Sequence, residues 1–171
     1  DQRSFDHLDG GGHWSETQRQ DALRDLHILD TPPEPAFDRI VALAHRIFQS
    51  KLVAISLLDE HRQWFKAKLG FDLYEAQRAG SFAEYTVASG KDYICVPDAL
   101  LDARFVEHPN VSGGVGIRFL AGAVLRARSG VPIGSLSLAD VAPRPDLAPG
   151  DSKALLDLAA LASDELTLRA T

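Results

Sequence analysis

The sequence has one cysteine, Cys95, and no methionine in 171 residues. A single thiol cannot form a disulfide within the chain, so the disulfide-rich scaffolds of small secreted proteins are excluded. No apolar run reaches the roughly 18 residues that a membrane-spanning helix needs. The polar, acidic N-terminus also lacks the pattern of a signal peptide. These absences predict a cytoplasmic protein without direct membrane insertion.

Positive charge is also scarce. Asp and Glu number 24 against 18 Lys and Arg, which gives a net charge of −6 and a pI near 5.4. The basic residues are scattered, without a long run anywhere in the sequence. Nucleic acids and anionic membranes both require a concentrated basic surface. We therefore expect neither of them as a partner.

The length corresponds to about one domain with a real core. Residues 1–15, DQRSFDHLDGGGHWS, are rich in Gly and Asp and have no periodicity, which predicts a flexible leader or linker. Residues 16–171 are then expected to form a single domain. The missing methionine fits either removal of the initiator or a chain that is one piece of a longer protein.

Three segments have the apolar spacing of amphipathic helices. They cover residues 16–29, 34–49 and 151–169. Asp151 is expected to cap the last of them. A shorter helix is predicted for residues 81–89, with Ser81 as N-cap and Glu84 at the third position of a capping box.

Two hairpins supply most of the predicted strands. In the first hairpin, residues 52–58 are almost wholly apolar, as in a strand covered on both faces. The residues after the turn alternate, which predicts that Trp64, Lys66 and Lys68 face one way and Phe65, Ala67 and Leu69 the other.

The second hairpin joins residues 118–127 to residues 131–138, and residues 93–96 form a further short strand. Residues 71–80 and 108–116 have no periodicity and are expected to be irregular. Tight turns between neighbouring strands indicate a mainly antiparallel sheet, with helices at the two chain ends. The pattern predicts the α+β class.

Five segments in order resemble a GAF domain, over about residues 18–169. They are ALRDLHILDTPPEPAFDRIVALA, SLLDEHRQWFKAKLG, VPDALLDARFVEHPNV, GIRFLAGAVLR and IGSLSLAD. The resemblance implies a fold related to PAS domains, with a central antiparallel sheet of about six strands, helices packed on one face and a small-molecule pocket on the other. It is strongest with the bacterial subset that precedes sensor histidine kinases and diguanylate cyclases. It therefore implies a C-terminal output domain and a homodimer formed through the helices.

Two departures from this subset concern the chemistry of the pocket. Members of the subset often carry Cys and His in the short helix after the first hairpin, where this chain has SFAEYT, residues 81–86. The last strand often carries a Cys, where Ser137 or its neighbours stand here. Covalent attachment of a bilin needs a cysteine at a suitable position in the pocket, and reduction of methionine sulfoxide needs several cysteines. The cofactor is therefore unknown, and none is predicted.

The usual motifs of catalysis and metal binding are missing. Gly90-Lys91 lacks the rest of a phosphate-binding loop, and the glycines of residues 112–116 lead into a strand instead of a helix. The six histidines share no ligand spacing, so no metal site is predicted. No G-x-S-x-G is present, and Cys95 lies in an apolar strand where a buried, unreactive thiol is expected.

Nine residues are candidates for the ligand pocket. Three acidic or basic ones stand at strand ends, where strand capping or an internal ion pair is the alternative role. Four aromatic ones would form an apolar wall or plain core. The fifth, Trp64, would stack on a planar ligand or cover the sheet edge, and one serine lies on the last strand. They are Asp98, Arg118, Asp140, Trp64, Phe82, Tyr85, Phe105, Phe119 and Ser137. Arg118 is favoured for an anion or ring carbonyl because its planar guanidinium has directional donors.

The first functional hypothesis is a non-catalytic sensory module that binds a small molecule, dimerises and controls an output domain such as a histidine kinase. Five leucines are the candidate dimer contacts: Leu23, Leu26, Leu158, Leu161 and Leu168. The alternative is a scaffold for dimerisation in which Phe82, Tyr85 and Phe119 fill the pocket. An enzyme that acts on a small metabolite through Asp98 or Asp140 is a third hypothesis.

Overall fold

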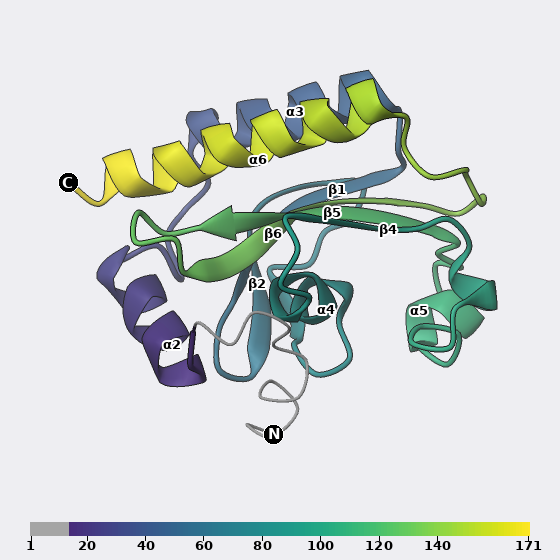
Figure 1. The fold of residues 1–171 in the computed structure, drawn as a ribbon, viewed down its shortest axis with the longest axis horizontal. Coiled ribbons are helices and arrows are strands. Elements are labelled where there is room, and N and C mark those ends of the chain that lie inside the picture. Colours follow the sequence, from purple (N-terminus) through teal and green to yellow (C-terminus); the bar gives the residue numbers. More distant parts are fainter. Residues whose placement is uncertain (1–13) are drawn as a thin grey trace.

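A computed structural model describes residues 14–171 as a six-stranded antiparallel sheet flanked by helices (Figure 1). The strand order is β3-β2-β1-β6-β5-β4, so the two central strands come from opposite halves of the chain. The strands are β1 (Leu52–Leu58), β2 (Arg62–Leu69), β3 (Glu75–Gln77), β4 (Tyr93–Val96), β5 (Phe119–Arg126) and β6 (Pro132–Asp140). The predicted α+β class and antiparallel sheet are confirmed. Most of the predicted leader, residues 1–13, lies outside the described residues.

The helices are α2 (Glu16–Asp25), α3 (Pro35–Phe48), α4 (Phe82–Ala88), α5 (Pro109–Ser112) and α6 (Pro149–Arg169), with a 3₁₀ turn η1 (Ala99–Leu101). Figure 1 shows α3 and α6 side by side over one face of the sheet, and α4 and α5 on the opposite side. Among residues 14–171, none of the helices has both the length and the apolar character of a membrane span.

The face covered by α3 and α6 holds the main hydrophobic core. Helix α3 presents a buried stripe at helical spacing, made of Phe37, Ile40, Val41, Ala44 and Phe48. It ends at Gln49, whose φ of 51° is left-handed and stops the helix. This core lies between the sheet and the helical layer, and it leaves the other face of the sheet free to form a site.

The start of α6 differs from the prediction. Asp151 lies in the first turn and does not cap the helix, because the N-cap is Ala148 and Pro149 occupies the first helical position. Proline fits this position well, since its φ is already helical and its missing N–H would have no partner there. The predicted N-cap of α4, Ser81, is confirmed, but the second bond of the predicted capping box is not formed, because the Ser81 backbone N–H donates to the Arg78 carbonyl. Ser15 caps α2, and Ser81 Oγ accepts a hydrogen bond from the Glu84 backbone N–H of α4 at 3.1 Å.

Two short elements lie in segments predicted to be irregular. Strand β3 pairs with β2 at the sheet edge, and α5 is one turn with Pro109 at its first position and the His108 side chain as cap. Both are only three or four residues long, which is too short for a periodic pattern to form.

A β-bulge in β2 contradicts the predicted alternation of its side chains. Ile55 pairs with Ala67 and the next residue, Ser56, pairs with Phe65, so Lys66 is the extra residue. A bulge places consecutive residues on the same face. Lys66 and Ala67 therefore both lie on the helical side, so the faces predicted for residues 67–69 relative to Trp64 are reversed.

Candidate functional site

A cavity of about 640 Å³ lies on the face of the sheet opposite α3 and α6. This volume is within the range of small-molecule sites. Its floor is formed by β1, β2, β5 and β6, and its walls by the segment before α4, α4 itself, α5 and the loops at residues 71–73 and 115–117. The cavity lies on the face of the sheet where the resemblance implies a ligand pocket.

The cavity floor combines apolar strand residues with a few hydroxyl and amide groups. Ser56 of β1 is fully buried and its Oγ accepts a hydrogen bond from Gln63 Nε2 at 3.0 Å. On β6, the hydroxyls of Ser135 and Ser137 are 2.9 Å apart. Ser56 and Ser135 are opposite each other in the ladder between β1 and β6, so these polar groups are neighbours on the same face.

Two pairs of aromatic rings form the cavity walls. The Phe65 and Phe71 rings meet edge to face at a centroid distance of 4.9 Å. On the side of α4, the Phe82 and Phe105 rings meet at 5.7 Å. Such pairs hold each other in defined orientations. The cavity therefore has rigid apolar walls on two sides.

The wall segment before α4 is fixed by Arg78. Its guanidinium donates to the Glu84 carboxylate of α4 at 3.0 Å and to the Asp59 carbonyl in the β1–β2 turn at 3.0 Å. It also donates to the Glu16 carboxylate of α2. Because the side chain is buried and charged, this network ties the cavity wall to both α2 and the turn.

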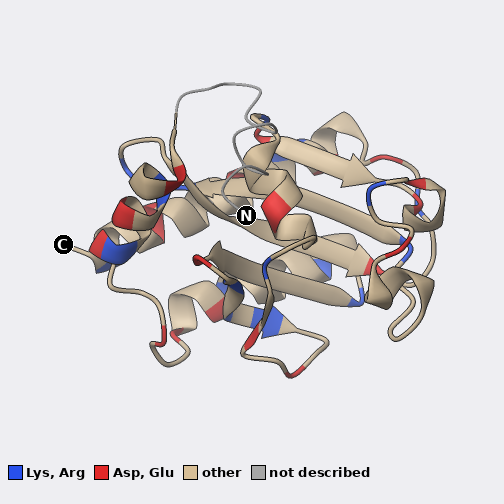
Figure 2. Ribbon diagram, turned by 90° about the horizontal axis from the view of Figure 1, so that it is seen from below, with Lys and Arg blue, Asp and Glu red and all other residues tan. Residues whose placement is uncertain are grey.

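The ionisable groups that line the cavity are Arg104 and His108, and no carboxylate is among the described lining residues. The Arg104 guanidinium donates two hydrogen bonds to Asp102, at 3.0 and 2.7 Å, which hold the pKa of that carboxyl below its usual value. Figure 2, viewed from below the sheet of Figure 1, shows acidic and basic segments interspersed without a broad region of one sign.

Three of the predicted pocket residues line this cavity, namely Phe82, Phe105 and Ser137. Tyr85 stands behind them, because its ring packs edge to face on Phe105 at 4.9 Å. The structure therefore brings these four residues together on the α4 side of the sheet. Whether they contact a ligand stays a prediction.

Two of the predicted aromatic residues face the other side. Trp64 and Phe119 are 6% and 0% exposed and belong to the core beneath α3 and α6. Their placement in the pocket was wrong. Gln63 and Phe65 precede and follow Trp64 in β2. Their side chains point to the opposite face of the sheet and line the cavity instead.

The three charged candidates form ion pairs outside the cavity lining. Asp98 accepts two hydrogen bonds from Arg118, at 2.8 and 2.7 Å, and it caps η1. The Arg118 guanidinium holds the pKa of Asp98 below its usual value, which makes this carboxylate a poor base. Asp140 pairs with Arg144, whose guanidinium also donates to the Phe48 carbonyl at 2.7 Å. The alternative role of strand capping and ion pairing is the observed one.

Sequence reasoning missed Gln63, Arg104 and His108. The signal for Gln63 was its place beside Trp64 in an alternating strand, since one of the two neighbours had to face the cavity. Arg104 and His108 lie in short loops and turns around α5, where no periodicity indicates direction. These loops reach the cavity because of how the strands are arranged in the sheet, which no local sequence pattern indicates.

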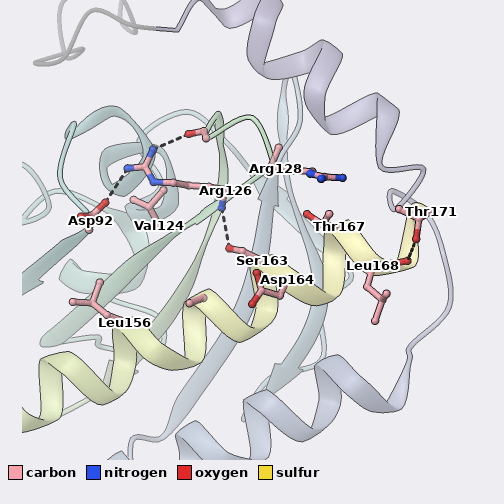
Figure 3. Close-up of a pocket in the computed structure, with 13 residues that line it drawn as sticks. Asp92, Val124, Arg126, Arg128, Leu156, Ser163, Asp164, Thr167, Leu168 and Thr171 are labelled. Carbon is pink, nitrogen blue, oxygen red and sulfur yellow. Dashed lines mark hydrogen bonds and ion pairs between the residues drawn. The ribbon is translucent and has the colours of Figure 1, made fainter.

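A second hollow of about 800 Å³ lies between the C-terminal half of α6 and the β5–β6 hairpin (Figure 3). The Arg126 backbone N–H donates to Ser163 Oγ at 3.0 Å, and its guanidinium donates to Asp92 and to the Gly130 carbonyl at 3.0 Å each. The first of these bonds joins the hairpin to α6. The other two hold the Arg126 side chain against the hairpin turn and against Asp92, which precedes β4.

The described residues offer little for catalysis or metal binding. No group of three or more His, Cys, Asp or Glu is placed to hold a metal in residues 14–171, and His7 and His13 lie outside that range. Burial raises the pKa of the Cys95 thiol, which disfavours the reactive thiolate. Its strand, β4, carries it on the side of the helical core.

Comparisons with known proteins agree with this fold. Residues 32–166 match the family model of the GAF domain. A cyclic di-GMP phosphodiesterase of Pseudomonas aeruginosa is 40% identical over 157 residues, which are 91% of this chain and 27% of that protein. The chain thus spans 27% of the length of this curated relative.

Two solved structures show the same architecture at low identity. The GAF domain of an Acinetobacter phosphoenolpyruvate-protein phosphotransferase has a TM-score of 0.66 and 18% identity, over 91% of this chain and 95% of that one. A free methionine-R-sulfoxide reductase from Neisseria meningitidis has a TM-score of 0.63 and 14% identity, over 93% and 98% of the two chains. From the family match over most of its length and the shared fold, we conclude that the chain belongs to the GAF domain family, whose members are sensory domains of signalling proteins.

Proposed function

We propose that this domain is a non-catalytic sensory module of a longer signalling protein. It binds a small molecule in the cavity beside α4. Binding of this molecule then changes the activity of an output domain. The cavity carries the proposal, because about 640 Å³ remains open between the sheet and α4. A domain that served only as scaffold would gain stability by filling that space with side chains.

The alternative of a filled scaffold depended on three aromatic side chains. Phe119 lies on the opposite face of the sheet. Phe82 packs against Phe105, and Tyr85 packs behind Phe105, so these rings form a wall and leave the interior open. This arrangement favours the ligand-binding hypothesis over the scaffold.

The output domain is inferred from the curated relative. That protein is a cyclic di-GMP phosphodiesterase, and the chain matches 27% of its length. We therefore propose an output that turns over cyclic di-GMP, and we favour it over the histidine kinase expected from the sequence. In such a protein the chemistry belongs to the output domain and the GAF domain regulates it.

A homodimer through the helical layer is part of the proposal. Of the five predicted contacts, Leu161 and Leu168 of α6 are exposed, at 53% and 67%. Leu43 and Ile47 add exposed apolar side chains on α3, the helix beside α6. Exposed apolar groups of this kind on a helical layer favour association.

The other three predicted contacts are excluded from such an interface. Leu23, Leu26 and Leu158 are 1%, 7% and 6% exposed and form part of the core of the domain itself. Their apolar spacing reflects packing within the chain. The proposed interface therefore uses the outer surface of α3 and α6 and not α2.

Native mass spectrometry of the domain purified from bacterial cells tests the sensory function. We expect a small molecule that dissociates on denaturation. An Ala54→Phe variant, which adds a ring to the cavity floor, should lose it, while the exposed Ala170→Phe control should keep it. A wild-type domain that carries no molecule and is not stabilised by a small-molecule cell extract would contradict the proposal and favour the scaffold.

A further inference from the structure

The arrangement of polar groups on the cavity floor limits which molecules can bind. Ser137 of β6, Ser56 of β1 and Gln63 of β2 line the cavity on three adjacent strands. The fully buried Ser135 of β6 is hydrogen-bonded to Ser137 and lies opposite Ser56. Polar side chains are uncommon on a buried sheet face, where apolar residues would pack at lower cost. Here they form a continuous row among apolar neighbours.

The hydrogen bonds within this row do not use the full hydrogen-bonding capacity of the Gln63 side chain. Gln63 Nε2 donates one of its two hydrogens to Ser56 Oγ. Among the described residues, this is the hydrogen bond that the Gln63 side chain forms, and Gln63 lines the cavity. A primary amide has two donors and one acceptor oxygen. One amide hydrogen and the Oε1 atom of Gln63 are therefore left for a molecule in the cavity.

Aromatic rings stand on both sides of the row. Phe65 is opposite Ser56 in the β1–β2 ladder, and Phe82 lies over Gly122, which is opposite Ser137 in the β5–β6 ladder. Flat aromatic walls favour a flat ligand. A planar ring system that lies between them would present its edge to the polar row.

The charge of the lining disfavours a cation. Arg104 and His108 are its ionisable residues, and no carboxylate is among the described lining residues to compensate a positive ligand. Desolvation of an ammonium group without a partner is costly. Because the Arg104 guanidinium is already paired with Asp102, a neutral ligand fits this lining best.

We propose that the cavity binds an aromatic lactam, a neutral planar heterocycle with adjacent ring N–H and C=O groups that pair with the Gln63 amide. The inference rests on the proposed function, since it assigns a ligand class to the same cavity. The lactam N–H donates to Gln63 Oε1, and its carbonyl accepts from Gln63 Nε2. The Ser137 hydroxyl is available to a second polar atom on the ring edge.

A matched pair of probes tests the recognition of the lactam. Quinazolin-4(3H)-one has the N–H and C=O edge, and quinazoline has the same bicyclic shape without it. Binding to the wild-type domain is measured by saturation-transfer NMR and calorimetry, after removal of any co-purified molecule. We expect the lactam to bind at least tenfold more tightly. A protonated aromatic amine, tryptamine, should bind more weakly than either.

Variants of the polar row test whether its side chains cause the preference for the lactam. In Gln63→Leu, the tenfold preference for the lactam should fall to about onefold, while quinazoline itself still binds. Ser137→Ala, which removes a single oxygen, is the milder second variant and should reduce lactam affinity severalfold. Ser152→Ala, in the first turn of α6 and outside the cavity lining, is the matched control and should leave both affinities unchanged. Thermal melting verifies that each variant is folded.

The outcomes separate this inference from the proposed function. Equal affinity of the two probes for the wild-type domain overturns lactam recognition and leaves a sensory cavity in place. Selectivity that persists in Gln63→Leu overturns the role of the floor. If neither probe binds and no small molecule co-purifies with the domain, both the ligand class and the sensory function are contradicted.

Discussion

Gly122 of β5 lies directly beneath Phe82 of α4, so that a Cβ at position 122 would be 2.9 Å from the Phe82 Cε1 atom. The same Cβ would be 3.1 Å from Thr86 Oγ1. Helix α4 therefore rests on the sheet as closely as a glycine permits. Because Phe82 also forms a wall of the cavity, this contact sets the height of the wall above the floor.

Gly122→Ala is expected to push α4 away from the sheet. Overpacking of this kind typically costs about 1–3 kcal/mol, and urea unfolding measures it. The control is Gly150→Ala in the first turn of α6, where an added Cβ meets nothing within 4 Å. That change should be neutral or mildly stabilising. Equal stability of the two variants would show that α4 does not rest tightly on β5.

Glu34 joins two cations that come from distant parts of the chain. Its carboxylate accepts a hydrogen bond from Lys66 in the β2 bulge and another from Arg169 at the end of α6, the latter at 2.7 Å. The Lys66 side chain is 0% exposed, whereas that of Glu34 is 32% exposed. Lys66 therefore depends on this carboxylate more than Glu34 depends on Lys66.

This asymmetry predicts unequal effects of removing either partner. Glu34→Gln leaves a buried ammonium without its carboxylate and should cost roughly 2–4 kcal/mol. Lys66→Met removes the buried charge itself, and Glu34 keeps Arg169, so the cost should stay below about 1.5 kcal/mol. Urea unfolding at pH 7 compares them. A larger cost for Lys66→Met would contradict the proposed dependence.

The stability of the domain should decrease in acid. Burial alone would raise the pKa of Glu34, but hydrogen bonds from Lys66 and Arg169 hold it below its usual value of 4.5. A carboxyl whose pKa is lower in the folded state contributes its full stabilisation above the pKa of the unfolded state. This contribution is lost as the pH falls through the folded value. We expect a constant urea midpoint between about pH 5.5 and 7 and a decline below about pH 4.5.

The Glu34→Gln variant should show a shallower decline over the same acid range, because it lacks this titrating group. Glu107→Gln is the control, since Glu107 is exposed and belongs to no ion pair among the described residues. Its profile should parallel that of the wild type. Identical slopes in all three proteins would show that Glu34 does not contribute to the acid sensitivity.

Charge on the outer surface of α6 should prevent the proposed dimer. Leu161→Glu places a carboxylate on a side chain that is 53% exposed, so the fold should be unaffected. Sedimentation equilibrium should then show a monomer where the wild type is a dimer. Leu101→Glu, in η1 and 85% exposed, is the matched control and should remain dimeric. A wild-type domain that stays monomeric at high concentration would rule out the interface.

Much of the architecture could be predicted from local patterns. The apolar stripe of α3, the capping residue Ser81 and the hairpin connections are signals that a few residues carry by themselves. Their expected positions agree with the structure to within a few residues. The assignment to the α+β class followed from their order along the chain.

The candidate site was predicted less well because it depends on which face of the sheet each side chain points to. Trp64 and Gln63 are neighbours in one strand, and only pairing with β1 decides which of them faces the cavity. The same holds for Phe119, whose ladder partner Asp140 indicates no face by itself. The loop residues Arg104 and His108 reach the cavity through the tertiary fold, which no local pattern encodes.

The extra residue in β2 has a consequence for how related sequences are aligned. Before Lys66, the odd-numbered positions Gln63 and Phe65 face the cavity, whereas beyond it the odd-numbered Ala67 faces the helical core. A relative without the bulge would be one residue shorter here. If its gap is placed on the wrong side of Lys66, core positions are compared with cavity positions. Ligand-binding residues transferred between GAF domains across this strand therefore require an alignment that is fixed by strand pairing.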